Sequence, residues 1–335
     1  MKLGLSQASY RWICYPWLRY DTPEYLYSER RLPYHNTIQP PPTLEAPIAW
    51  LLERITAHDF TSLYMDSGWL ADEAGAAAFK RRCAELGLTY FAAATANLAA
   101  EPDDWGSPRY DRAARAAAAP VYRVAVRGAG WTSGTEFQQA VRAMELAAAA
   151  GARAVNVVHR EAGRLHRFTK DPPLARQLDN VIRNMRSLVP VAEALGLTMT
   201  NESHMDYRVA DFMQVRAAVA SPWLLHCFDF ANSISVVEDP LDAAQLAAPY
   251  TLFTHIKDMR VQPAVLLGEP MFFHTPIGLG HVPVEAILDV LQAHAPDPAS
   301  LHHCVEVPTM PEFDPEQWLA ASVQWLRSNC GRFWT

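Results

Sequence analysis

The sequence predicts a single (β/α)8 barrel of parallel strands. Between Leu197 and Asp258, three apolar runs follow one another and each ends in a polar cluster: LTMTNESHMD, LLHCFDFANS and LFTHIKDMR. A join of helix, glycine and strand also recurs, as AELGLTYF, AAAGARAVNVV and EALGLTMT. The glycine supplies the left-handed turn that ends each helix, and strands that alternate with helices favour a parallel sheet. A length of 335 residues suits one barrel with insertions, spanning residues 1–335.

The first elements follow from their apolar patterns. The chain begins with a short apolar segment, KLGLSQASY, which we expect to be the first strand. A helix is expected to start at Pro47, because apolar residues recur at helical spacing in Ile48, Leu51, Leu52 and Ile55. The runs FTSLYMD and LTYFAAAT are then predicted as the second and third strands.

Residues 14–45 form an insertion after the first strand that is rich in Tyr, Trp, Arg and Pro and has no regular period. A loop of this length is usually functional or disordered. A barrel would place it over the catalytic face, where aromatic residues such as Trp17 could stack on a sugar ring. The alternative is a loop that packs on the barrel or contacts another subunit.

The middle of the chain offers one strand too many. Residues 121–128 and 152–159 both have the apolar pattern of a strand, which makes nine candidates for eight barrel positions. We favour 152–159 as the fourth strand, because convincing helices precede and follow it. The later helix, about 174–195, contains Pro190, which predicts a kink or a restart there.

Residues 259–281 are predicted as a long loop between the seventh and eighth strands. Gly278 and Gly280 mark a tight turn near its end, and a lone G-x-G indicates close backbone packing better than it indicates phosphate binding. The last helix is expected to begin after Asp314, with Pro315 in its first turn.

Each polar cluster contains one good metal ligand. Glu202 and Asp229 are 27 residues apart, Asp229 and His255 are 26 apart, and a fourth apolar run, HHCVEVP, carries Glu306. Ligands that recur once per strand and helix, at the ends of strands, are how a barrel of this kind builds its site. Three carboxylates and one imidazole suit an open, oxygen-rich site for Mn²⁺, Mg²⁺, Co²⁺ or Zn²⁺. Taken singly, Asp229 could instead cap the following helix, and Glu306 could pair with an arginine.

The ordered set NESH, FDFANS, THIKD, PIGLGHV and VEVP resembles the motifs of the xylose-isomerase-like TIM-barrel superfamily. The resemblance covers residues 1–10 and about 45–327. It implies a sugar isomerase or epimerase with one divalent metal ion, preferably Mn²⁺, held by Glu202, Asp229, His255 and Glu306. Such enzymes remove a proton next to a carbonyl through a metal-stabilised enediolate, and the resemblance implies Glu202 and Glu306 as the acid–base pair. Lys257 and Arg260 are expected to bind substrate oxygens.

One position departs from the pattern of the sugar 3-epimerases, which commonly have a histidine where this chain has Asn232. This puts simple epimerisation of a free ketose in doubt and makes Asn232 a candidate substrate-binding residue. The alternative is a 3-keto-glycoside lyase similar to the C-glycoside deglycosidases, with His159 at the end of the fourth strand as its general base. Such enzymes often need a small partner subunit. An endonuclease-IV-like nuclease and a non-catalytic sugar-binding barrel are weaker alternatives.

Composition and charge limit the partners and the cellular compartment that we expect. The formal net charge of −7 argues against a nucleic-acid partner, which normally needs a basic face. The five cysteines are scattered without a C-x-x-C pair, and the amino terminus has no apolar signal segment, so we expect a reduced, cytoplasmic protein. No apolar run approaches the length of a membrane span. The expected partner is a small carbohydrate, with a homo-oligomer left open.

Overall fold

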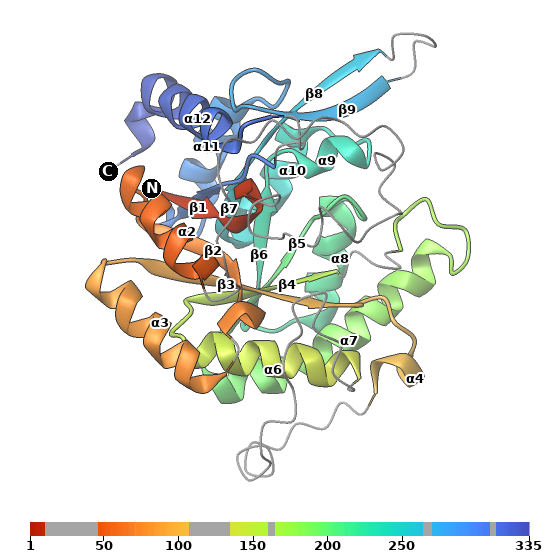
Figure 1. Cartoon of the computed structure of the whole chain (residues 1–335). Coiled ribbons are helices and arrows are strands. Elements are labelled where there is room, and N and C mark those ends of the chain that lie inside the picture. The colour runs from red at the N-terminus through yellow and green to blue at the C-terminus, as the bar shows by residue number, and fades with distance from the viewer. Residues whose placement is uncertain are drawn as a thin grey trace, which may run out of the picture.

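The computed structural model of the chain describes residues 1–10, 46–70, 72–106, 135–159, 165–263, 270–308 and 313–334. Its centre is a closed barrel of parallel strands in the order β1-β10-β7-β6-β5-β4-β3-β2, which confirms the predicted (β/α)8 fold (Figure 1). The barrel strands are β1 (Lys2–Ser6), β2 (Ser62–Asp66), β3 (Thr89–Ala96), β4 (Ala154–His159), β5 (Thr198–Glu202), β6 (Leu224–Asp229), β7 (Thr251–Ile256) and β10 (His302–Val305).

Helices cover the outside of the barrel (Figure 1). Neighbouring helices pack on one another, as α6 does on α7 and α7 on α8. The longer helices are α2 (Ala46–Ala57), α3 (Glu73–Glu85), α6 (Glu136–Ala149), α7 (Leu174–Leu195), α8 (Val209–Val219), α10 (Pro240–Ala247), α11 (Val284–His294) and α12 (Pro315–Asn329), and the short ones are α4 (Pro102–Trp105) and α9 (Asn232–Ser235).

The recurring joins of helix, glycine and strand form as expected. Gly87, Gly151 and Gly196 have positive φ angles of 65°, 73° and 61°, and each leads from a helix into the next barrel strand. Asp314 caps the start of α12, where its side chain accepts a hydrogen bond from the backbone N–H of Glu316. These local signals predicted the alternation correctly.

The fourth barrel strand is β4, within the predicted range 152–159, and it pairs with β3 and β5. The competing segment 121–128 lies outside the described residues, as do Trp17 and the insertion 14–45. The expected restart at Pro190 is wrong, because α7 runs through it. A continuous buried stripe, including Met185, Leu188 and Val191, holds both halves of α7 against the barrel.

The predicted loop 259–281 instead contains an antiparallel hairpin, β8 (Asp258–Pro263) and β9 (Pro270–Thr275), which extends from the barrel in Figure 1. A tight turn follows it and is held by Asp258. The carboxylate of Asp258 accepts hydrogen bonds from the backbone N–H groups of Gly278, Gly280, Val282 and Met259. The G-x-G sequence therefore serves close packing around Asp258, as predicted.

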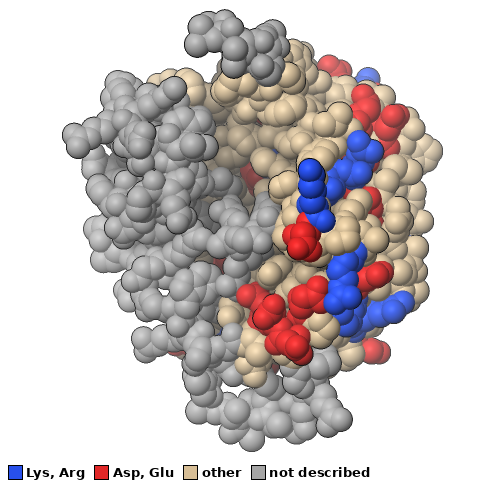
Figure 2. Space-filling view, turned by 90° about the vertical axis from the view of Figure 1, so that its right-hand side faces the viewer, with Lys and Arg blue, Asp and Glu red and all other residues tan. Residues whose placement is uncertain are grey.

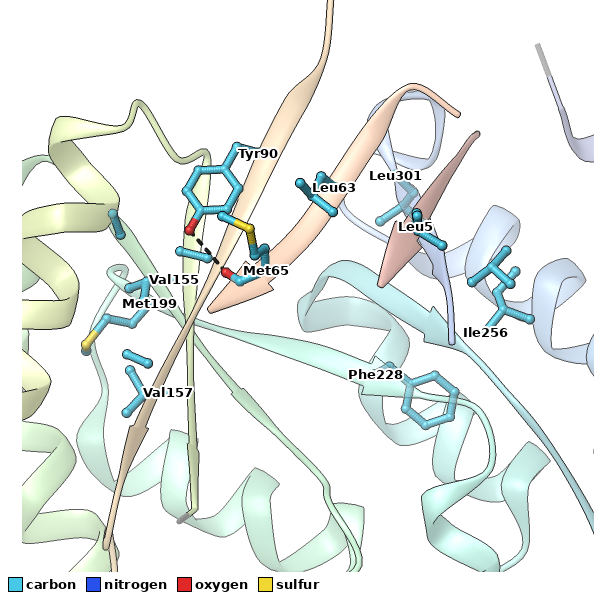
Figure 3. Packing of buried hydrophobic residues seen from close by; sticks show 14 of the residues in the cluster. Leu5, Leu63, Met65, Tyr90, Val155, Val157, Met199, Phe228, Ile256 and Leu301 are labelled. Carbon is cyan, nitrogen blue, oxygen red and sulfur yellow. Dashed lines mark hydrogen bonds between the residues drawn. The ribbon is translucent and has the colours of Figure 1, made fainter. Parts of the chain in front are cut away.

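Each barrel strand alternates between an outward face and a face that fills the lumen. Leu63, Met65, Val155 and Val157 belong to the large apolar core of the molecule, and Figure 3 shows them in that cluster. There the hydroxyl of Tyr90 also donates to the carbonyl oxygen of Met65 at 3.0 Å. A second, smaller cluster consists of strand residues of the opposite parity: Tyr64, Phe91, Ala93, Ala154, Cys227, Phe253 and Cys304.

The strand register stacks the lumen residues in rings of four, taken from alternate strands as in other barrels of this type. One ring consists of Tyr64, Asn156, Cys227 and Cys304. Toward the carboxyl ends of the strands, the next ring consists of Ser6, Ala93, Glu202 and His255. The last, which we call the mouth ring, consists of Asp66, Val158, Asp229 and Glu306.

Candidate metal centre

The four residues predicted as metal ligands converge at the carboxyl ends of β5, β6, β7 and β10. Nδ1 of His255 lies 3.2 Å from Oε1 of Glu202, 3.5 Å from Oε2 of Glu306 and 3.9 Å from Oδ2 of Asp229. Ligand atoms of Asp229, His255 and Glu306 all lie within 4.8 Å of one another. None of the four residues is more than 5% exposed. The structure therefore brings them into one buried cluster.

Asp229 serves this cluster and the adjacent backbone at the same time. Its Oδ1 accepts hydrogen bonds from the N–H groups of Ala231 at 2.9 Å and Asn232 at 3.0 Å, where α9 begins. Its Oδ2 faces Lys257 and His255. The helix-capping alternative and the ligand prediction are thus compatible, because each uses a different oxygen.

Burial and neighbouring charges compete at each carboxyl group. Burial alone would raise the pKa of Glu202, but the charge and hydrogen bond of His255 lower it to about 2. At Glu306, Lys257 and His255 likewise outweigh burial and hold the pKa well below its ordinary value. At Asp229 burial dominates and raises the pKa. Burial disfavours the imidazolium of His255, yet Glu202 and Glu306 raise its pKa to about 9.

Lys257 supplies a fixed positive charge. Its Nζ lies 2.6 Å from Oε1 of Glu306 and 2.9 Å from Oδ2 of Asp229. Buried carboxylates need compensating charge, and Lys257 with a protonated His255 compensates two of the three. A divalent cation that displaced the His255 proton would make the group neutral. The donor set and its charge therefore fit one divalent metal ion.

Two residues that hold the glutamates were not predicted. Nδ2 of Asn156 donates to Oε2 of Glu202 at 2.7 Å, and Oγ of Ser6 donates to Oε2 of Glu306 at 2.8 Å. Asn156 is itself held by Thr200, whose hydroxyl donates to its Oδ1. A single amide inside the apolar run AVNVVH was the available signal for Asn156. Ser6 offered none, because it is 300 residues from Glu306.

Asn232 lies inside the centre. Its Nδ2 donates to Oε1 of Glu202 at 3.3 Å, and its Oδ1 accepts from Nζ of Lys257 at the same distance. An amide can make both contacts because it carries a donor and an acceptor. Asn232 thus links Glu202 to Lys257 within the buried cluster.

Other predicted site residues are not brought to this cluster. His159 shares the parity of Val155 and Val157 on β4 and lies beside Asp206, with 3.9 Å between Nε2 and Oδ2. Strand alternation thus gives it the outward parity, whereas a general base for the proposed lyase would have to face the mouth. Arg260 is exposed on β8 and donates to the carbonyl oxygen of Leu279. Conversely, Sγ of Cys227 lies 3.8 Å from Nε2 of His255 and was not predicted.

Comparison with known proteins identifies the family. Residues 55–329 match the family described as xylose isomerase-like TIM barrel. The chain belongs to this family. A stretch of 86 residues is also 36% identical to the uncharacterized protein YihM of Escherichia coli (strain K12), covering 26% of this chain and 23% of YihM. The aligned part thus spans about a quarter of that relative.

Solved structures of the xylose isomerase-like fold are similar over nearly the whole chain. The 3-keto-D-glucoside 4-epimerase YcjR from E. coli is 16% identical with a TM-score of 0.59, covering 98% of this chain and 99% of YcjR. The IOLI protein, solved with a bound zinc atom, is 12% identical with a TM-score of 0.59 and full coverage of both chains. At these identities the likeness shows the fold.

Charged side chains of both signs lie side by side on the described part of one face (Figure 2). Figure 2 shows Lys and Arg side chains interspersed with Asp and Glu on the described part of one face, without a continuous basic stripe there. Within the described ranges, no helix combines the length and apolar character required to cross a membrane. Structures of the same fold also include an L-ribulose 3-epimerase and a probable 3-DHS dehydratase, at 16% and 11% identity.

Proposed function

We propose that this protein is a divalent-metal-dependent sugar isomerase or epimerase that removes a proton next to a carbonyl group. The convergence of three buried carboxylates on Nδ1 of His255 carries the proposal. Glu202, Asp229, His255 and Glu306 would hold one metal ion, with Mn²⁺ preferred and Mg²⁺, Co²⁺ or Zn²⁺ as alternatives. When bound, the ion would supply positive charge that polarises the substrate carbonyl and favours the enediolate.

Glu202 and Glu306 are the proposed proton carriers. The pKa of Glu202 is lowered to about 2 and that of Glu306 also lies below its ordinary value, so both are carboxylates at neutral pH and can accept a proton. Asn156 and Ser6 each hold one oxygen of these glutamates and thereby fix the direction of the other. One glutamate would take the proton from carbon, and the other would first take up a proton from solvent and then return it to the sugar.

Lys257 and Asn232 are the proposed substrate-binding residues within the cluster. Lys257 can donate to a substrate oxygen from the position it occupies between Asp229 and Glu306. Asn232 offers an amide beside Glu202. Trp17 remains a proposed contact from the insertion 14–45, whereas the hydrogen bond of exposed Arg260 to Leu279 gives that residue no support.

A second candidate is a lyase that acts on 3-keto-glycosides. It is favoured by Asn232, where the sugar 3-epimerases have a histidine, and YcjR acts on a 3-keto-glucoside according to its name. It would use the same metal ion but expel the aglycone after proton removal. The outward position of His159 weakens its proposed role as the base. A lyase of this kind would be expected to work with a small partner subunit.

The first test is the metal content of the purified protein by elemental analysis, with Glu202→Gln beside it. We expect about one divalent metal ion per wild-type chain and a loss in Glu202→Gln. The matched control is Glu238→Gln, because Glu238 is also a half-buried carboxylate, bonded to Val209 and Ala210 outside the centre. No metal in the wild type, even after reloading, would remove the proposal, and three zinc ions per chain would favour the nuclease.

The reaction itself is tested by incubating ketoses and 3-keto-glycosides with the metal-loaded protein in D₂O and observing them by NMR. Proton removal next to the carbonyl replaces hydrogen by deuterium there. Exchange with a new epimer or isomer supports the leading proposal, and release of an aglycone supports the lyase. Exchange that persists in Glu202→Gln and Glu306→Gln would contradict the assigned proton carriers.

A further inference from the structure

Asp66 is a carboxyl group in the barrel mouth that the proposed chemistry does not use. It ends β2 and shares the inward parity of Tyr64, whose ring lies 4.3 Å from the ring of His255. The register places it in the mouth ring with Asp229 and Glu306. Strands β2 and β6 are four apart in the barrel order, so Asp66 lies across the lumen from Asp229.

The side chain of Asp66 is held in place but does not belong to the charge cluster. Its Oδ1 accepts a hydrogen bond from the N–H of Gly68 at 2.8 Å, and its own N–H donates to Oε1 of buried Gln7 at 3.1 Å. In the described part of the chain, no ion pair joins it to Lys257 or His255. Unlike Asp229, it keeps partial solvent exposure. A ligand in the mouth can therefore reach it.

The opposite halves of the mouth differ in chemistry. The candidate metal ligands come from β5, β6, β7 and β10, whereas the half formed by β2, β3 and β4 presents Asp66, exposed Thr95 and Val158. A sugar whose carbonyl end lies at the cluster and whose chain crosses the mouth would bring its remaining hydroxyl groups to the other half. A carboxylate accepts hydrogen bonds from such hydroxyl groups more strongly than a neutral acceptor does.

We propose that Asp66 binds a hydroxyl group at the end of the sugar remote from the metal centre and thereby sets a preference for longer, polyhydroxylated substrates. The inference rests on the proposed function, because it assumes a sugar held across the mouth. Burial raises the pKa of Asp66 to about 6, so the group is mainly a carboxylate above that pH. A purely structural role would be to cap the turn Ser67–Leu70 through Gly68.

The test compares binding of xylitol and glycerol to the metal-loaded protein at pH 8, by calorimetry or ligand-observed NMR. We expect wild type to bind xylitol more tightly than glycerol, and Asp66→Asn to weaken xylitol binding by about tenfold or more while glycerol binding is unchanged. Asn keeps an oxygen for the Gly68 N–H, so a merely capping role would leave binding at the wild-type level. The matched control is Asp72→Asn, which alters a similar but exposed carboxylate on the same connection.

The outcomes separate this inference from the proposed function. Equal xylitol binding by wild type and Asp66→Asn, or a wild type that does not distinguish xylitol from glycerol, would overturn the role of Asp66. These readouts need no turnover, so they hold even if no ketose exchanges deuterium. If turnover is found, Asp66→Asn should lower kcat/KM for a hexulose about tenfold or more and leave that for dihydroxyacetone unchanged.

Discussion

At the scale of single residues, the candidate centre depends on side chains that hold its glutamates. Asn156 is fully buried, and its Nδ2 donates hydrogen bonds to Oε2 of Glu202, at 2.7 Å, and to the hydroxyl oxygen of Tyr64, at 3.1 Å. Thr200 fixes the opposite side of the amide. Mutation of residues that orient metal ligands in this way typically weakens metal binding or activity.

We therefore expect Asn156→Leu, which has a similar branched shape but lacks the donor, to weaken Mn²⁺ binding by about 10–100-fold. The measurement is the Mn²⁺ dissociation constant, from titration followed by electron paramagnetic resonance. Asn184→Leu is the matched control, because Asn184 is equally buried but donates to Leu98 and Ala100 away from the centre. Equal Mn²⁺ affinity of the two variants would show that Asn156 does not position Glu202.

The sequence could predict the charged residues of the centre but not their supports. Glu202, Asp229 and His255 are strong ligand types that each follow an apolar run, so chain order and spacing indicate their meeting point. Asn156 is an isolated amide in a strand, and such residues are often buried for packing reasons. Along β4, alternation from Val155 and Val157 gives His159 the outward parity, which opposes its expected role as a base at the mouth.

At the scale of elements, Asp258 connects β7, the hairpin and the turn before α11. Its four backbone hydrogen bonds require the chain at Gly280 to pass very close. A Cβ atom at Gly280 would lie 2.0 Å from Oδ1 of Asp258 and 2.6 Å from the carbonyl oxygen of Met259. The carboxylate of Asp258 therefore holds the backbone of the turn in place, and the turn itself fixes the orientation of the carboxylate.

Gly280→Ala should lower the free energy of unfolding by about 1–3 kcal/mol, because the added methyl group forces the turn away from Asp258. Urea unfolding followed by circular dichroism gives this quantity. Gly331→Ala is the control, since a Cβ atom there would have no heavy atom within 4 Å. If both variants are as stable as wild type, the turn is not tightly packed on Asp258.

Local signals were sufficient for the barrel elements and failed for the hairpin. Gly87 and Gly196 could be recognised because the same join recurs before β3 and β5. The β8–β9 hairpin has apolar residues on exposed positions, including Met271 at 43% and Phe272 at 42% exposure, so its pattern resembles neither a half-buried strand nor a typical loop. The only turn signal between its two strands is Gly268 in the mostly apolar stretch AVLLGE, which is weak evidence for a hairpin.

At the scale of the whole molecule, the barrel buries several histidines away from the candidate centre. Burial lowers the pKa of His226 and of His302 to about 4 and that of His303 to about 3. Nδ1 of His303 contacts the hydroxyl of Thr254 at 2.7 Å. An ordinary histidine in the unfolded chain has a pKa near 6.5, so each of these side chains gains a proton on unfolding when the pH lies below that value.

The sign of the effect on stability follows from this proton uptake. Above about pH 6.5 the three histidines are neutral in both states and contribute no pH dependence; below it the unfolded chain binds the additional protons and is favoured. We expect the free energy of unfolding to fall from pH 6.5 toward 4, by up to about 1.4 kcal/mol per pH unit for each histidine. The pKa of Asp66 is raised to about 6 in the folded protein, so Asp66 binds a proton in the folded state before it does so in the unfolded chain. This opposes part of the fall.

The decisive measurement is the slope of unfolding free energy against pH, in the presence of a chelator, for wild type and His303→Gln. Removing one buried histidine should make the slope between pH 6 and 4 shallower by about one proton. The absolute stability of the variant does not enter this comparison. An unchanged slope would mean that His303 is protonated in the folded protein as readily as in the unfolded chain.

The alternation of the barrel strands has a consequence for how this scaffold can change over evolution. On β2, Leu63 and Met65 lie in the large apolar core while Tyr64 and Asp66 have the lumen parity, so one short segment carries two separate sets of constraints. Mutations in one set leave the other nearly untouched. New substrate preferences can therefore arise by exchange of Asp66 or Val158 without loss of the helix packing, and laboratory libraries restricted to the mouth ring should retain a high fraction of folded members.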